Sequence, residues 1–87
     1  MFEVLVDDLV QRQVDGWSRA AQRAFDELKT VLELNPKGGR PAHAKFPDAP
    51  SRMMAFGPHK EGLAGYIVID REDRRDVVIV EVTWLGE

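Results

Sequence analysis

The segment VVIVEVTWL, residues 77–85, constrains the fold of this chain more than any other. It is β-branched almost throughout, and such side chains favour strands because they pack well on a pleated surface. Its first half is apolar on both faces, which indicates a central position in the sheet. Glu81 and Thr83 then make one face of its second half polar. With 87 residues, the chain is expected to form a single domain, residues 1–87, around this strand.

Three further segments have the pattern of strands that extend this sheet. Residues 2–6, FEVLV, and residues 63–70, LAGYIVID, place alternate side chains on opposite faces. Residues 51–56, SRMMAF, predict a shorter strand. The last three strands are joined by short turns, so the sequence predicts a three-stranded antiparallel meander to which the N-terminal strand is added.

A long amphipathic helix is predicted over residues 17–34. Its apolar side chains recur at steps of three and four, which places them on one stripe of a helix. They are Trp17, Ala20, Ala21, Ala24, Phe25, Leu28, Val31 and Leu32. Asn35 and Pro36 end the helix, because proline restricts the residue before it, and a shorter helix is predicted before Gly16. The predicted fold is therefore α+β: an N-terminal strand, a short and a long helix, then the meander, with the helices packed on one face of the sheet.

The charge of the chain is unevenly distributed. Its net charge of −3 argues against nonspecific coating of nucleic acid, which depends on many phosphate contacts. Residues 37–60 nevertheless hold five basic side chains and one acid, and glycines and prolines predict a long loop over residues 37–50. The sequence shows no dinucleotide, phosphate-loop or metal-binding motif, so no cofactor and no metal are expected.

The N-terminus, MFEVLVDD, lacks the basic start of a signal peptide. The longest apolar runs fall far short of the ~20 residues that a membrane span needs. The chain has no cysteine, as suits a reducing compartment. We therefore expect a soluble cytoplasmic protein without membrane contact.

The basic segment supplies the side-chain types of a metal-independent ribonuclease. Such an enzyme needs a base, an acid and cations around the phosphate, roles that suit histidine, arginine and lysine. Arg52 is the first candidate catalytic residue, because a strand holds it and its guanidinium can grip a phosphate through two hydrogen bonds; His59 is the second. Lys45 and Lys60 are candidate substrate-binding residues. The alternative is that this segment, His43 included, is a solvated loop with ordinary surface charge.

Three aromatic side chains also have two interpretations each. Tyr66, the third candidate substrate-binding residue, could stack on an RNA base or donate a proton, or could fill the edge of the core with its hydroxyl in water. Trp17 and Trp84 are predicted to belong to the core rather than to stack on a ligand. Because Trp84 lies near the C-terminus, its exposure would mark a surface for a partner or for a homodimer.

The order of these elements resembles the RelE/ParE superfamily of toxins from bacterial toxin–antitoxin pairs. The resemblance covers nearly the whole chain and lies in the N-terminal strand, the helix WSRAAQRAFDELKTVLELNP and the hairpin GYIVIDREDRRDVVIVEVTWL. It implies a compact sheet with helices behind it and one face open to substrate. RelE-like members cleave messenger RNA on the ribosome, ParE-like members act on DNA gyrase, and both are neutralised by an antitoxin that wraps around them.

Within this resemblance, Arg52 matches the arginine on the strand after the basic loop. The family's Tyr-Arg-Val strand reads Tyr66-Ile67-Val68 here, so its arginine is replaced by isoleucine. The last strand ends without the His, Arg or Tyr that many nuclease members carry there. These differences leave two hypotheses open.

The first hypothesis is a RelE/ParE-like toxin that inhibits growth and has an antitoxin partner. It would be either a ribosome-dependent endoribonuclease, with Arg52 stabilising phosphate and His59 moving protons, or a gyrase inhibitor. The second is a non-catalytic protein-binding module of the same fold that has lost toxin activity. The isoleucine in place of the family arginine and the acidic net charge favour the second hypothesis.

Overall fold

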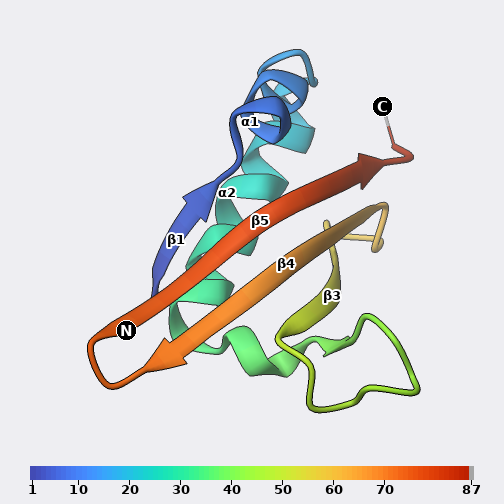
Figure 1. Ribbon diagram of the computed structural model, residues 1–87. Coiled ribbons are helices and arrows are strands. Elements are labelled where there is room, and N and C mark those ends of the chain that lie inside the picture. Colours follow the sequence, from blue (N-terminus) through green and yellow to red (C-terminus); the bar gives the residue numbers. More distant parts are fainter. Residues whose placement is uncertain (87) are drawn as a thin grey trace.

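The computed structural model describes residues 1–86 and has an α+β fold with two α-helices and a five-stranded mixed sheet (Figure 1). The elements follow in the order β1 (Glu3–Val6), α1 (Asp8–Asp15), α2 (Arg19–Leu34), the 3₁₀ helix η1 (Pro36–Gly38), β2 (Arg40–Pro41), β3 (Ser51–Phe56), β4 (Gly62–Arg71) and β5 (Arg74–Trp84). No helix among the described residues is long and apolar enough to cross a membrane.

The strands lie in the order β1-β5-β4-β3-β2. β3, β4 and β5 form the predicted antiparallel meander, and β1 joins it as predicted, running parallel to β5. β5 thus has a neighbour on each side, as predicted from its first half, which is apolar on both faces. Its pairing with β4 shifts between Gly65, opposite Glu81, and Tyr66, opposite Ile79, so a bulge leaves Val80 without a partner.

The segment predicted as one loop, residues 37–50, contains two short elements, η1 and β2, that the prediction lacked. β2 places Arg40 opposite Met53 and Pro41 opposite Arg52. Two residues are too few to show the alternation by which a strand is identified in sequence, so only pairing with β3 makes this segment a strand. The sheet is therefore larger than the predicted meander with one added strand.

The long helix begins two residues later than predicted because Ser18 caps it. The Oγ of Ser18 accepts a hydrogen bond from the backbone N–H of Ala21 at 3.2 Å, which satisfies one of the free donors in the first turn. The helix ends at Leu34, directly before the Asn-Pro pair that predicted its end. In Figure 1, α2 lies behind the sheet and α1 follows β1 at the top of the view; Val10 and Val14 of α1 are buried in the core.

The core lies between the helices and one face of the sheet. Phe25, Leu28 and Leu32 of α2 are fully buried, and they belong to the same cluster as Val77 and Ile79 of β5. The helix layer and the sheet layer both contribute apolar side chains to this core, so their burial supplies the main stabilisation of the fold.

An aromatic cluster closes one end of this core. Trp17 and Trp84, both predicted as core residues, lie with their ring centroids 5.9 Å apart, and Phe56 lies within 6.4 Å of each. Trp84 is half-buried in this cluster, so it packs inward rather than forming a separate exposed patch.

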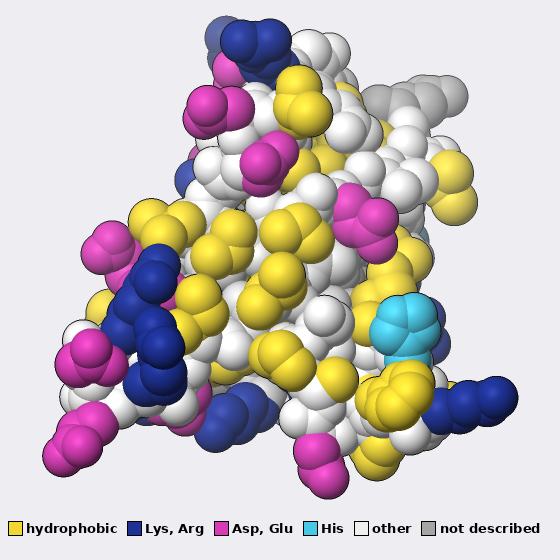
Figure 2. Space-filling view, in the orientation of Figure 1, with side chains coloured by type: hydrophobic (Ala, Val, Ile, Leu, Met, Phe, Trp, Pro, Cys, Tyr) yellow, Lys and Arg dark blue, Asp and Glu magenta, His cyan; other side chains and the backbone are white. Residues whose placement is uncertain are grey.

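The other side of the sheet has no helix on it, and we call this side the open face (Figures 1 and 2). Alternation along β4 shows the two sides: Ala64, Tyr66 and Val68 are buried under the helices, and the residues between them point the opposite way. The apolar side chains of the open face are Leu5, Met53, Leu63, Ile67, Ile69, Val78 and Val80.

Candidate functional site

Arg52, the first candidate catalytic residue, lies on the helix side of the sheet and not on the open face. It stands directly opposite the buried Tyr66 in the β3–β4 pairing, so both side chains share one face. Its Nε donates a hydrogen bond to the carbonyl oxygen of Gly39 at 3.0 Å, and its Nη2 donates to the same oxygen. The guanidinium therefore ties β3 to the chain just after η1, which is a structural contact.

Tyr66, a candidate substrate-binding residue, is 1% exposed and therefore does not reach a substrate. Its hydroxyl donates a hydrogen bond to the carbonyl oxygen of Pro36 at 2.6 Å, rather than standing in water as the core interpretation had it. Burial raises the pKa of this phenol above its usual range, and the nearby charge of Arg52 opposes the rise. The Tyr66 hydroxyl thus links β4 to η1 on the helix side of the sheet.

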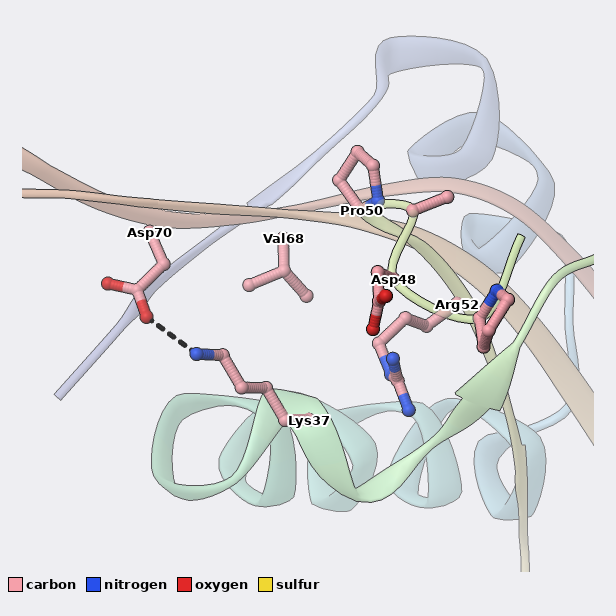
Figure 3. Close-up of a pocket in the computed structure, with 8 residues that line it drawn as sticks. Lys37, Asp48, Pro50, Arg52, Val68 and Asp70 are labelled. Atoms are coloured by element: carbon pink, nitrogen blue, oxygen red, sulfur yellow. Dashed lines mark hydrogen bonds and ion pairs between the residues drawn. The ribbon is translucent and has the colours of Figure 1, made fainter.

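A pocket of about 360 Å³ lies beside this contact and includes Lys37, Asp48, Arg52 and Asp70 in its lining (Figure 3). Lys37 Nζ lies 2.8 Å from Asp70, and this hydrogen bond holds the pKa of the Asp70 carboxyl below its usual range. Asp48 and Arg52 lie together on the opposite side of the pocket. Two cations and two carboxylates leave the pocket without excess positive charge for a phosphate.

His59 and Lys60 lie in the turn between β3 and β4, at the far end of β3 from the guanidinium of Arg52. The backbone N–H of His59 donates to the Glu61 carboxylate at 2.8 Å. Hydrogen bonds from the backbone N–H groups of Glu61 and His59 lower the pKa of that carboxyl. Lys60 has a φ of 60°, so it supplies the left-handed residue of the turn.

The candidate catalytic residues therefore do not meet. Four residues of β3, from Met53 to Phe56, separate Arg52 from the turn, a span of about 13 Å at about 3.3 Å per strand residue. General acid–base chemistry needs its groups within hydrogen-bond reach of one reacting centre. The predicted catalytic pair, with Arg52 for the phosphate and His59 for the protons, therefore does not act at one reacting centre.

The remaining basic-segment residues lie in the loop between β2 and β3. Lys45 is exposed there. His43 is also exposed, and it borders a shallow hollow of about 230 Å³ on the open face together with Val80 and Glu81. Within residues 1–86, no group of three His, Asp or Glu side chains is arranged to hold a metal ion.

The feature that sequence reasoning missed is the apolar character of the open face. Figure 2 shows hydrophobic side chains gathered across the middle of this face. On this face, Leu5 is 37% exposed and Val80 is 43% exposed. Ile67 and Val78 are each half-buried. The sequence contained a signal for this surface. Two neighbouring strands are apolar on both faces, yet a single layer of amphipathic helices covers only one face of a sheet, so the other face stays apolar and uncovered.

Charged side chains stand at opposite ends of this apolar surface. Arg71 and Arg74 lie directly opposite each other at the β4–β5 hairpin, and Arg74 Nε contacts Asp76 at 2.5 Å. At the other end, Glu81 lies across the sheet above Gly65, where a Cβ would come within 2.7 Å of the Glu81 side chain. The open face is thus apolar in its centre, with Arg71 and Arg74 beside the acids Asp76 and Glu3 at the hairpin end and Glu81 towards the other end.

No protein-family model, no curated protein and no solved structure matches this chain.

Proposed function

We propose that this chain is a RelE/ParE-like toxin component that acts by binding a protein target and not by cleaving RNA. The open face is the observation that carries the proposal, because it presents aliphatic side chains where a nuclease needs cations and proton-transfer groups. The element order, with the N-terminal strand beside the last strand and the helices behind the sheet, supports the family resemblance.

Cleavage of RNA has little support in the geometry. A phosphodiester substrate is bound through cations, and its cleavage needs charge stabilisation at the developing transition state. Arg52 faces the helix side and bonds the backbone, and His59 lies in a distant turn. Ile67, which occupies the position of the family arginine, is one of the aliphatic residues of the open face.

Binding of a protein fits the same surface. Contiguous exposed apolar patches mark interaction sites, and the centres of protein interfaces are depleted in charged residues. In the superfamily that the chain resembles, ParE-like members act on DNA gyrase, which is a protein target. The open face favours that kind of action over the ribonuclease of RelE-like members, and an antitoxin would be the neutralising partner.

The test is induced expression in bacteria, with growth, translation and DNA supercoiling measured in parallel. We expect growth arrest with a change in supercoiling and no cleavage of messenger RNA. Val80→Lys should relieve the arrest, because it places a charge on the open face. Leu9→Lys is the control, since Leu9 is 71% exposed and belongs to α1 rather than to a strand of this face, and it should leave the arrest intact.

Arg52→Ala does not separate a catalytic role of Arg52 from a structural one, because it removes the hydrogen bond to the Gly39 carbonyl and so weakens the fold. If the wild-type chain is harmless at high expression, the toxin proposal fails. The second hypothesis, a non-catalytic protein-binding module of the same fold, then stands, because the apolar open face with Ile67 at its centre favours binding in either case.

A further inference from the structure

We propose that the open face binds a second copy of this chain, face to face and with the strands antiparallel, in a two-fold symmetric dimer. This inference shares the open face with the proposed function. Dimer formation is measured on the purified chain and growth arrest in cells, so either proposal can be refuted without the other.

The first argument is the size of the apolar surface. β4 and β5 have ten and eleven residues, so at about 3.3 Å per residue they run about 33–36 Å. β1 and β3 are shorter, with four and six residues, so at about 4.8 Å strand spacing these four strands give a face of about 490 Å² before side chains and rim are counted. Stable protein interfaces bury about 800 Å² per partner, so the strands supply more than half of that area, and side chains and rim residues would have to supply the rest.

The second argument is the charge at the hairpin end of the face. Like charges directly opposite each other on a sheet are destabilising, yet Arg71 and Arg74 are cross-strand partners. Asp76 compensates Arg74. Among residues 1–86, Arg71 has no carboxylate within ion-pair distance, so its charge is left available to a partner. Figure 2 shows basic side chains with acidic ones beside them at one edge of the apolar surface.

The third argument is the opposite charge at the other end. Glu81 stands seven positions along β5 from Arg74, about 23 Å at about 3.3 Å per residue. Within the described part of the chain, Glu81 also forms no ion pair. A partner that pairs both of these charges needs an apolar centre, an acid opposite Arg71 and a base opposite Glu81, and a second copy turned end to end has this pattern.

Symmetry then selects one orientation. In a face-to-face dimer the two-fold axis lies in the plane between the sheets. An axis parallel to the strands would place Arg71 near its own symmetry mate, which is repulsive. An axis perpendicular to the strands places Arg71 of each copy against Glu81 of the other, so each contact occurs twice, as in other self-complementary interfaces.

The experiment is sedimentation velocity and light scattering of the purified chain over a range of concentrations. The wild type should show a concentration-dependent dimer. Val80→Lys should raise the dimer Kd about tenfold or more, because it buries a charge in an apolar interface. Leu9→Lys adds the same charge on α1 and should leave the Kd unchanged. Circular dichroism of each variant verifies that the fold is retained.

A charge swap tests the orientation. Arg71→Glu or Glu81→Arg alone should each raise the Kd about fivefold, because each breaks two symmetry-related rim pairs of modest strength. The double variant restores both pairs at an unchanged net charge of −3 and should recover the wild-type Kd. A wild type that stays monomeric, or equal effects of Val80→Lys and Leu9→Lys, would overturn the dimer on this face. A double variant no better than the single ones would overturn the antiparallel orientation.

Discussion

The buried hydroxyl of Tyr66 gives a sharp test of how the loop after α2 is held. Tyr66→Phe keeps the ring in the core and removes only the hydroxyl that donates to the Pro36 carbonyl at 2.6 Å. Pro36 is buried, so its carbonyl loses its side-chain donor in a place with little access to water. Such a loss costs about 1–2 kcal/mol of unfolding free energy. For a domain of this size, about 4–8 °C in melting temperature corresponds to each kcal/mol.

The effect should depend on pH in one direction. The pKa of Tyr66 is raised in the folded protein, chiefly by burial, above the value of about 10 of an unfolded chain. The neutral phenol is therefore the form that the fold prefers. Its contribution is fully present below about pH 10 and is lost as the pH rises through the folded pKa. The stability advantage of the wild type over Tyr66→Phe should narrow in that range.

The chain contains one tyrosine, so this group can be observed alone. Urea denaturation of the wild type and the variant at neutral and alkaline pH gives the stability difference. The tyrosinate absorbance band of the folded and the urea-unfolded wild type gives the two titrations. A Tyr66→Phe variant as stable as the wild type at neutral pH would contradict this role of the hydroxyl. So would a folded phenol that titrates no higher than the unfolded one.

Two further predictions concern the same region and its surroundings. Gly39→Ala should destabilise the protein by about 1–3 kcal/mol, because a Cβ would lie 2.2 Å from the tyrosine hydroxyl and 2.6 Å from a β3 carbonyl oxygen. Gly16→Ala is its control: the nearest atom is 3.6 Å away and φ is −88°, so thermal melting should show an unchanged or slightly higher stability. Asp70→Asn removes the carboxylate that Lys37 contacts. In the wild type, the hydrogen bond from Lys37 lowers the pKa of the Asp70 carboxyl. The Asp70 contribution to stability is present above the unfolded pKa of about 3.9 and is lost as the pH falls through the folded pKa. Urea denaturation should therefore show the unfolding free energies of the wild type and the variant converging on acidification. A difference that stays constant with pH would contradict the ion pair.

The sequence alone determined the number and order of the main elements. The steps of three and four over residues 17–34 and the β-branched run over residues 77–85 depend only on local periodicity, so they were correctly identified as α2 and β5. The Asn-Pro end of the long helix was equally local. β2 was missed because a strand of two residues exists only through its pairing with β3.

The tertiary structure decided which way the side chains point. Alternation along a strand separates two faces, but where both faces are apolar, it does not tell which one the helices cover. From the sequence, Arg52 therefore looked available and Tyr66 had two interpretations, and packing of α2 and η1 placed both on the covered side. The same choice left Ile67 and Val80 uncovered, since two helices on one side of a sheet cover only that side. The character of the open face follows from this layer arrangement, which no local pattern contains.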